Sequence, residues 1–364
     1  MSSSEKVVLT LNAGSSSLKY ALYAGTRIAE GKIDGLGRNY SDELARVLDW
    51  TTQHLNGLPL AAVGHRIVHG GDFTKPMRLD EAILATLAGL SPLAPLHQPH
   101  NLAAVAALAR LRPGLTQVGC FDTAFHHSMG DTARRFGLPR RLEASGLKRY
   151  GFHGLSYEYI AGRLAELEPE RARGRIIVAH LGSGASLCAL QSGRSIDTTM
   201  SFTPLDGLVM GTRCGALDPG VILYLIQTAG MDAEAVQDLL YDQSGLLGVS
   251  GISADMRVLL SEDAGSAKEA IELFVYRAAR EIGALSASLG GLDGIVFTGG
   301  IGENAPTIRA AIAARLAWQG LALDEAANQA GKTTISTQGS AVTAWCIPTD
   351  EEAVIARQTL SLAN

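Results

Sequence analysis

The chain has 364 residues, of which 46% are hydrophobic and 41 are glycine, and its formal net charge is −5 at neutral pH. This length is sufficient for two domains of ordinary size, each with its own core. A weakly acidic chain offers no electrostatic case for binding nucleic acid. Residues 82–101 contain no Asp, Glu, Lys or Arg but include Pro92, Pro95 and two histidines, which excludes them as a membrane-spanning helix.

The cysteines and the N-terminal sequence indicate the cellular compartment of the protein. The cysteines Cys120, Cys188, Cys214 and Cys346 lie far apart and form no C-x-x-C pair or zinc spacing. Free thiols are typical of a reducing cytosol. The residues before Val7 do not form a signal peptide, because the apolar run that follows them is too short. We therefore expect a cytoplasmic protein that contacts neither membranes nor nucleic acid.

Short β-like runs alternate with helical patterns, as in an α/β protein. The runs are Val7–Leu11, Ala61–Val63, Gln117–Phe121, Ile176–His180 and Gly294–Thr298. The clearest helix spans Glu269–Leu285, where apolar residues recur at spacings of three, four and seven. A further helix is predicted with Asn304 as its N-cap, Pro306 in its first turn and Gly320 at its end.

The stretch Asn12–Tyr20 reads N-A-G-S-S-S-L-K-Y and follows the first apolar run. It does not match the G-x-x-x-x-G-K-[ST] phosphate loop, because residues 18–23 resemble a second strand rather than a helix. One interpretation is an ordinary β-hairpin turn. The other is a turn whose backbone N–H groups and hydroxyls bind a phosphate.

Residues 11–18 are similar in sequence to residues 181–187, where a Gly/Ser-rich turn again follows an apolar run. Two similar units about 170 residues apart favour a duplicated domain, and a chance similarity between Gly/Ser turns is the alternative. If the duplication is real, the two turns could hold one polyphosphate across a cleft. Gly182-x-Gly184 begins like a dinucleotide fingerprint, but the third glycine is missing, so a Rossmann fold is not favoured.

Six segments along the chain resemble the acetokinase family of acetate and propionate kinases. They are NAGSSSLKY at 12–20, GHRIVHGG at 64–71, FDTAFH at 121–126, RYGFHG at 149–154, FTPLDGLVMGTRCG at 202–215 and TGGIGEN at 298–304. The resemblance implies a duplicated two-domain α/β fold of the actin, Hsp70 and sugar-kinase ATPase type, with an interdomain cleft. The implied domains are 1–124 with a returning helix at 352–364, and 125–351.

The resemblance also implies an activity, namely reversible transfer of the ATP γ-phosphoryl group to acetate, giving acetyl phosphate and ADP. The metal would be Mg²⁺, with Mn²⁺ as an alternative. Such a transition state spreads negative charge over the phosphoryl oxygens, so catalysis needs cations, hydrogen-bond donors and positioning. The resemblance places Arg66 at the carboxylate, Arg213 at the transferring phosphoryl group, and His153 as a hydrogen-bond donor to the phosphoryl oxygens. Asp122 would orient an arginine or metal-bound water.

The remaining site residues follow from the same resemblance. The acyl pocket would comprise Val68, Leu96, Phe152 and Pro204, beside Arg66. The nucleotide would contact Ser15, Ser17, Lys19, His180, Leu181, Gly182, Ser183, Gly184, Asp255, Met256, Arg257, Gly300, Ile301, Gly302, Glu303 and Asn304. Asn12 and Glu351 would lie at the metal. A homodimer is implied as well.

Several positions depart from the family pattern. Ser183 stands where the family usually has asparagine, Ala216 where it has aspartate, and Asp350 where it has asparagine. Leu155 and Tyr157 replace threonine and histidine. These changes leave two alternatives open, a propionate or butyrate kinase with the same machinery and an ATP-binding sensor of the same fold that has lost catalysis.

Overall fold

The computed structural model describes residues 6–13, 17–34, 40–95 and 97–363. The chain divides into two compact units, each treated separately below. Unit 1 consists of Met1–His127, Phe152–Tyr159 and Asp350–Asn364, and unit 2 consists of Ser128–Gly151 and Ile160–Thr349. The expected domain boundaries at residues 124 and 351, and the interdomain cleft, stay predictions.

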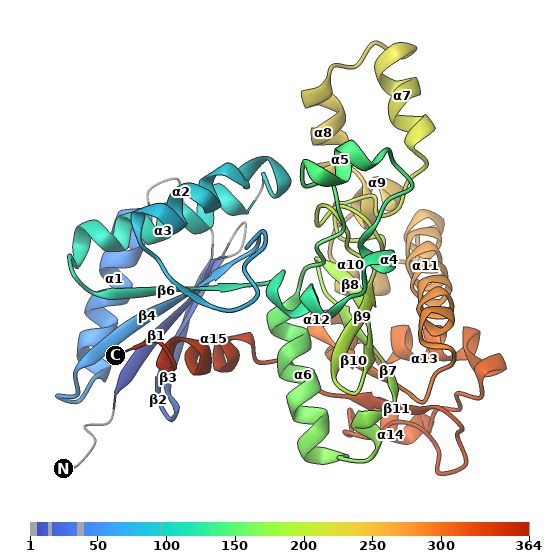
Figure 1. Ribbon diagram of the computed structural model, residues 1–364. Helices are drawn as coiled ribbons and strands as arrows, with labels where there is room; N and C mark the ends of the chain where they lie inside the picture. The colour runs from blue at the N-terminus through green and yellow to red at the C-terminus, as the bar shows by residue number, and fades with distance from the viewer. Residues whose placement is uncertain (1–5, 14–16, 35–39, 96, 364) are drawn as a thin grey trace. The chain divides into compact units, whose positions relative to one another are not determined.

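Within the described residues, unit 1 contains a six-stranded sheet in the order β3-β2-β1-β4-β6-β5 (Figure 1). Its strands are β1 (Val7–Ala13), β2 (Ser17–Ala24), β3 (Thr26–Asp34), β4 (Leu60–Ile67), β5 (Met77–Arg78) and β6 (Thr116–Phe121). Its helices are α1 (Tyr40–His54), α2 (Glu81–Gly89), α3 (Gln98–Leu111) and α15 (Glu351–Leu360). β1 runs antiparallel to β2 and parallel to β4, and β4 runs parallel to β6.

Both faces of this sheet are covered, which is why β1 is buried along its whole length. Leu9 and Val63 point to one face, where α1 and α3 pack on them, whereas Val8 and Ala62 point to the other face, against α15. Strands buried on both faces read as continuous apolar runs instead of alternating ones. The N-terminal sequence V-V-L-T-L follows this pattern.

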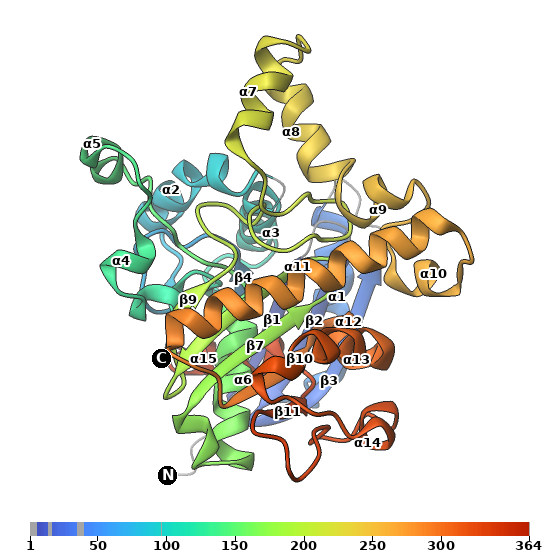
Figure 2. The ribbon, with the colours of Figure 1, turned by 90° about the vertical axis from the view of Figure 1, so that its right-hand side faces the viewer.

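Unit 2 contains, within the described residues, a five-stranded sheet in the order β11-β10-β7-β8-β9. Its strands are β7 (Arg175–Leu181), β8 (Ala185–Gln191), β9 (Arg194–Thr198), β10 (Gly294–Thr298) and β11 (Thr343–Cys346). Its helices include α4 (Asp131–Arg134), α5 (Arg140–Ala144), α7 (Pro219–Gln227), α8 (Ala233–Asp242), α9 (Gly245–Ser250), α10 (Met256–Ser261), α11 (Gly265–Leu289), α12 (Gly299–Asn304), α13 (Pro306–Arg315) and α14 (Glu325–Gln329). Helix α6 (Gly154–Leu167) begins in unit 1 and continues into unit 2. The long helix α11, orange in Figure 2, runs across β7, β8 and β9 and buries one apolar side on them.

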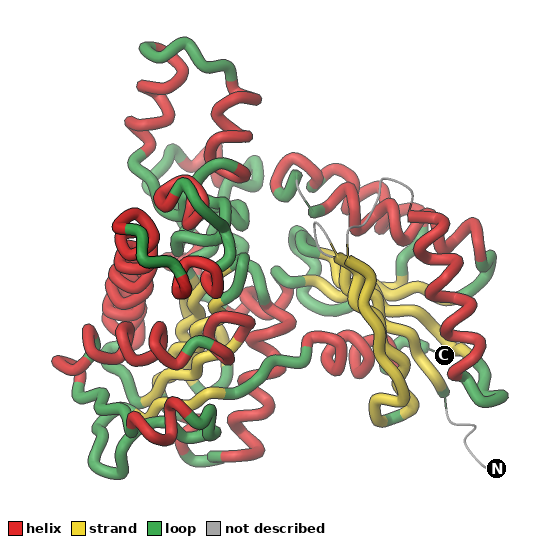
Figure 3. Tube along the Cα trace, turned by 180° about the vertical axis from the view of Figure 1, so that it is seen from behind, coloured by secondary structure: helices red, strands yellow, loops and turns green. Residues whose placement is uncertain are grey.

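The two sheets repeat one topology. In each, an antiparallel three-stranded meander (β1-β2-β3 or β7-β8-β9) is extended by two strands parallel to its first strand, β4 and β6 or β10 and β11. Both sheets are flanked by helices, red in Figure 3. The shared strand order supports the duplication predicted from the sequence similarity between residues 11–18 and 181–187.

The predicted strands are all present, and β10 has the predicted bounds, whereas β4 is five residues longer than Ala61–Val63. The prediction for Asn304 was wrong. Residues 299–304 form the helix α12, and Asn304 is its last residue, with its amide donating to the carbonyl of Gly300 at 2.9 Å. Helix α13 begins at Pro306 with Ala305 as its N-cap. No helix in the described ranges is long and apolar enough to cross a membrane.

Candidate active site

In unit 1 a buried ion pair lies where two neighbouring parallel strands end. Arg66 is the penultimate residue of β4, and Asp122 directly follows β6. The guanidinium is bidentate: Nε donates to Oδ1 of Asp122 at 3.1 Å, and Nη2 donates to Oδ2 at 2.7 Å. The carboxylate is 1% exposed and the guanidinium side chain 15%. Carboxyl ends of parallel strands are a common place for ligand-binding groups in α/β proteins.

The third nitrogen of this guanidinium connects the pair to the opening hairpin. Arg66 Nη1 donates to Oδ1 of Asn12 at 3.2 Å and lies 3.8 Å from Oε2 of Glu351. The Asn12 amide in turn donates to Glu351 at 2.9 Å and to Glu352 at 3.1 Å. The cluster therefore joins β1, β4, β6 and the first turn of α15 through hydrogen bonds that involve charged groups, which are the stronger kind.

Burial and the neighbouring charges shift the pKa values of several groups in this cluster. Burial alone would lower the pKa of Arg66, but Asp122 and Glu351 outweigh it and raise the pKa. Burial raises the pKa of Asp122, and the facing guanidinium opposes this. Burial and the neighbouring Glu351 also raise the pKa of Glu352. Lys19 opposes this rise at Glu352, so the cations Arg66 and Lys19 face three closely spaced carboxyl groups, those of Asp122, Glu351 and Glu352.

This donor set fits a magnesium ion shared with phosphates. No cluster of three or more His, Cys, Asp or Glu side chains suited to a metal occurs among the residues that the structure describes. Mg²⁺, however, commonly takes only one or two protein carboxylates and completes its shell with water and phosphate oxygens. Glu351 and Glu352 supply such carboxylates, and a cation would relieve the repulsion between them. The Asn12 oxygen accepts from Arg66 and its NH₂ group faces the two carboxylates, so Asn12 would ligate the ion only after its amide turned over.

A strained turn surrounds Asp122. His153 has a left-handed backbone (φ 58°), and its N–H contributes a hydrogen bond to the Asp122 carboxylate. The next N–H, of Gly154, donates to the carbonyl of Asp122 at 3.0 Å. A Cβ at Gly154 would lie 2.0 Å from that carbonyl oxygen, so only glycine allows this approach. Non-glycine residues with positive φ are sparsely populated and cluster at functional sites.

The apolar side chains predicted to hold the acyl group divide between the units. Val68 and Phe152 are buried in unit 1, where Phe152 packs edge-on against His69 with ring centroids 5.5 Å apart. Pro204 lies in unit 2, where its carbonyl accepts from Nη1 of Arg213 at 2.9 Å.

In unit 2 the two predicted nucleotide segments meet at one edge of the sheet. His180, near the end of β7, pairs in register with Thr298, the last residue of β10. A Cβ placed on Gly182 would lie 3.8 Å from the N–H nitrogen of Gly300, so the β7–β8 turn adjoins the start of α12. The Glu303 carboxylate accepts from the N–H of Gly299 at 2.8 Å and holds this turn in place. The small residues Gly182, Ser183 and Gly184 therefore lie beside Gly300 at this edge of the sheet.

Asp255 and Arg213 lie on loops that adjoin the same turn. Gly211 donates its N–H to the Ser183 carbonyl at 2.9 Å, and a Cβ on Gly211 would lie 3.2 Å from the Ala254 carbonyl oxygen. Asp255 caps α10 by accepting from the N–H of Arg257 at 2.8 Å, and the same carboxylate pairs with the exposed Arg257 guanidinium.

The family model described as the acetokinase family matches residues 39–357. The chain belongs to the acetokinase family. An acetate kinase of Rhodopseudomonas palustris (strain TIE-1) is 52% identical over 392 aligned positions, covering 98% of each chain. The solved acetate kinase of Porphyromonas gingivalis is 35% identical and superposes with a TM-score of 0.88, covering 99% of this chain and all of that one (100%). A solved propionate kinase from Francisella tularensis is also 35% identical, with a TM-score of 0.91 over 98% and 99% of the two chains.

These likenesses confirm the recognised family, the duplicated ATPase fold and the expectation of a phosphotransferase enzyme. Of the site residues predicted for this acetokinase, Ser15 and Leu96 lie outside the described residues, as does the side chain of Ser17. Lys19 faces Asn12 across the β1–β2 hairpin and is exposed. Glu351 occupies the first turn of α15, as an N-terminal carboxylate stabilised by the helix dipole.

Sequence reasoning missed several residues that position the site. Asn101 is buried and accepts from the Val68 N–H at 3.1 Å while donating to the Ala13 carbonyl at 3.0 Å. Gln98 accepts from the His69 N–H at 3.0 Å and donates back to the same residue's carbonyl at 2.9 Å. The only available signal was the spacing of three between two amides at the start of α3, which places them on one side of the helix.

Proposed function

We propose that this acetokinase transfers the γ-phosphoryl group of ATP to acetate, forming acetyl phosphate and ADP, and catalyses the reverse reaction. An acetate oxygen attacks the γ-phosphorus as the bond to the ADP oxygen breaks, so no proton has to be removed from the ionised carboxylate. The proposal rests chiefly on the buried Arg66–Asp122 pair, because its fixed guanidinium is suited to a carboxylate. The relatives' names and the 52% identity support the same reaction.

Arg66 holds the carboxylate in this mechanism, and Asp122 orients Arg66. The bidentate contact uses Nε and one Nη2 hydrogen, which leaves the remaining N–H bonds of both Nη atoms to be shared with neighbours and substrate. Val68 and Phe152, both buried in unit 1, supply the apolar atoms for the methyl group. Pre-organised donors of this kind need no rearrangement when the reaction occurs.

The phosphoryl group and nucleotide are assigned to other residues. Arg213 and His153 stabilise negative charge on the transferring group. The turn at His180–Gly184, with Ser183 in place of asparagine, binds phosphate oxygens, and Asp255–Arg257 and Gly300–Asn304 contact the adenosine. Mg²⁺, or Mn²⁺ in its place, would be held by Glu351 and Asn12 and would neutralise phosphate charge.

Arg66→Lys tests the carboxylate assignment, because it keeps the charge but removes the planar fork. We expect the KM for acetate to rise and kcat/KM to fall by about 100-fold, with the KM for ATP nearly unchanged. Arg163→Lys, an exposed arginine on α6, is the control. Wild-type kinetics for acetate in a folded Arg66→Lys protein would contradict the assignment.

Propionate is the second candidate substrate, favoured by the similarity to a solved propionate kinase. One additional methylene in an apolar pocket changes binding by only about 1–3 kcal/mol. We expect both acids to react, and their relative kcat/KM values decide which is preferred. Absence of transfer to either acid, in folded protein that binds ATP, would support the ATP-binding sensor instead.

We also propose a cytoplasmic homodimer. The four cysteines are all free thiols, which is consistent with a reducing compartment. Helix α7 has no buried residue and exposes Leu223 (54%) and Tyr224 (60%), together with other apolar side chains. Exposed apolar patches of this kind mark protein interfaces. The double variant Leu223→Glu/Tyr224→Glu should sediment as a monomer, whereas unchanged sedimentation of a wild-type dimer would exclude α7 from the interface.

A further inference from the structure

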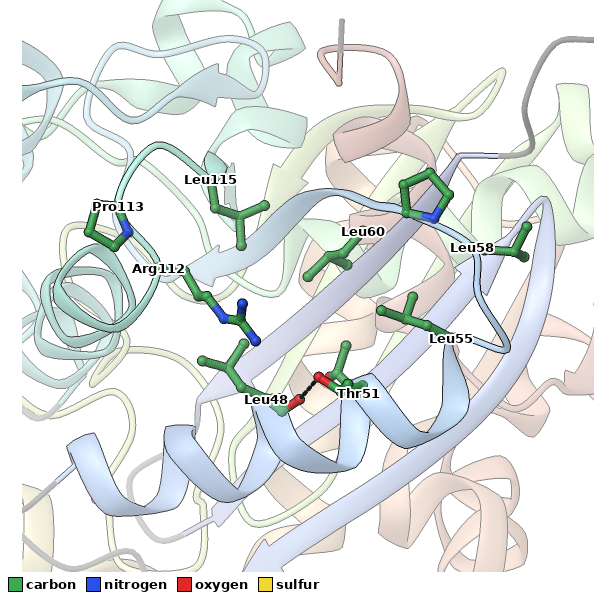
Figure 4. A pocket seen from close by; sticks show the side chains of 10 residues that line it. Leu48, Thr51, Leu55, Leu58, Leu60, Arg112, Pro113 and Leu115 are labelled. Carbon is green, nitrogen blue, oxygen red and sulfur yellow. Dashed lines mark hydrogen bonds between the residues drawn. The ribbon is translucent and has the colours of Figure 1, made fainter.

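An apolar pocket lies in unit 1, away from the site described above. Its volume is about 510 Å³, and its lining comes from α1, the α1–β4 loop and the α3–β6 loop (Figure 4). The lining residues are Leu48, Thr51, Thr52, Leu55, Leu58, Pro59, Leu60, Arg112, Pro113 and Leu115. The volume falls in the range of about 300–1,000 Å³ that is typical of small-molecule sites.

The pocket and the pair Arg66–Asp122 lie at opposite ends of the strands β4 and β6. It lies where β4 and β6 begin, at Leu60 and just before Thr116, whereas the ion pair lies where the same parallel strands end. Six residue steps of β4 separate Leu60 from Arg66, or roughly 20 Å at the rise of a strand. A ligand bound here would therefore not touch the reacting groups.

Two polar groups in the lining could recognise a ligand. The hydroxyl of Thr51 is buried, with the residue 1% exposed, and it has no hydrogen-bond partner among the described residues. The neighbouring Thr52 hydroxyl, by contrast, donates to the Leu48 carbonyl at 2.9 Å. A buried hydroxyl without a partner costs free energy, and rotation of the Thr51 side chain toward the pocket would let a ligand oxygen satisfy it.

Arg112 is the second group. It is exposed, follows the last residue of α3, and forms no ion pair or side-chain hydrogen bond with any residue that the structure describes. No acidic residue lines the pocket. One guanidinium at an apolar pocket matches a single negative charge, and a doubly charged phosphate would remain half neutralised. A planar carboxylate fits the guanidinium fork.

The apolar part of the lining indicates the chemistry of the part of the ligand beyond its carboxylate. Leucine and proline side chains form most of the wall, and the leucines Leu55, Leu58, Leu60 and Leu115 are only partly buried. A two-carbon acid would leave most of 510 Å³ unfilled, since one water molecule takes about 30 Å³. A longer apolar chain would cover the exposed leucine surface.

We propose that this pocket binds a medium-chain carboxylate, with the carboxylate at Arg112 and the Thr51 hydroxyl and the alkyl chain against the leucines. The site is separate from the substrate site and takes a ligand with the same head group but a longer chain.

Isothermal titration calorimetry of the full chain with octanoate, in excess acetate, tests the proposal. Acetate occupies the substrate site, so octanoate should still bind with one-to-one stoichiometry. Arg112→Gln should weaken binding by about tenfold and Thr51→Val by roughly threefold. Leu55→Trp, which fills the pocket, should abolish binding. Arg110→Gln, an exposed arginine of α3 outside the lining, should leave the affinity unchanged. Acetate kinase activity reports that each variant is folded.

Four outcomes would overturn the proposal. The first is no octanoate binding to active wild-type protein. The second is binding that survives both Arg112→Gln and Leu55→Trp, and the third is binding that is lost on adding acetate. The fourth is 1-octanol binding as tightly as octanoate, which would remove the role of the charge. Dissociation of a wild-type oligomer by Leu55→Trp, without any octanoate binding, would identify the pocket as a self-association surface instead.

Discussion

Replacing Asp122 with asparagine removes the charge that faces Arg66 while keeping the size of the side chain. The asparagine oxygen can accept one of the two guanidinium contacts, at 3.1 and 2.7 Å in the native pair, but its NH₂ group opposes the other. Of the carboxylates that raise the pKa of Arg66, Glu351, 3.8 Å away, and Glu352 then remain. Breaking a buried ion pair in this way lowers the free energy of unfolding by about 3–5 kcal/mol. We expect a decrease near the lower limit, about 3 kcal/mol, because Glu351 remains beside the guanidinium.

Activity should fall as well, since Arg66 is no longer held in one orientation. Loss of a charge-assisted hydrogen bond corresponds to about 1.5–3 kcal/mol, so kcat/KM for acetate should drop by roughly 10- to 150-fold. Urea unfolding and steady-state kinetics measure the two effects. Asp293→Asn is the matched control, because Asp293 forms a similar bidentate pair with Arg175 but is 42% exposed. Equal losses in both variants, or native stability and kinetics in Asp122→Asn, would refute the reasoning.

Three further changes probe other parts of the molecule. Burial lowers the pKa of His65 to about 4 from 6.5 in the unfolded chain, so its contribution to stability is complete above pH 6.5 and is lost as the pH falls towards 4. The free energy of unfolding, measured with urea, should be about 2 kcal/mol lower at about pH 5 than above pH 6.5, and this decrease should be absent in His65→Gln. Gly299→Ala would set a Cβ 2.8 Å from the Leu181 carbonyl oxygen at φ 77° and should raise the KM for ATP by about tenfold. Gly265→Ala, at the start of α11 with nothing within 4 Å of its Cβ, should leave it unchanged. Ser183→Asn restores the usual family residue and should lower the KM for ATP by about fivefold without changing that for acetate, and an unchanged value would remove Ser183 from phosphate binding.

The strands and the duplication could be predicted from the sequence because both depend on local pattern. Strands buried on both faces leave continuous apolar runs, and β10 was placed with its true bounds. The hairpin after β1 was recognisable because residues 18–23 lacked a helix signal. Short-range patterns of this kind survive in the folded state when tertiary contacts agree with them.

The helix start near residue 304 could not be placed, because tertiary contacts decided it. Asn304 is a good N-cap residue by type, but the Glu303 carboxylate binds the N–H groups of Gly299 and Thr349 and holds residues 299–304 as a helix of their own. Thr349 is 46 residues away in the sequence. No local pattern could have indicated this contact.

The supporting residues of the site were missed for a related reason. Gln98 and Asn101 are polar residues at a helix start, where exposed capping residues are common, and their burial becomes visible only once α3 packs over the ends of β1 and β4. The sequence placed Asp122 directly after the apolar run Gln117–Phe121, whereas Arg66 lay beyond the predicted strand Ala61–Val63. It could not show that they form a bidentate pair, because that depends on β4 and β6 being neighbours.

The most direct test of the proposed function is hydroxylamine trapping of acyl phosphate formed by the wild-type protein with ATP and Mg²⁺. Formate, acetate, propionate and butyrate would be compared under identical conditions. We predict a hydroxamate signal that is highest with acetate or propionate and is lost when Mg²⁺ is removed. No hydroxamate with any of these acids, from folded protein that still binds ATP, would contradict the assignment of this chain as an acetate kinase.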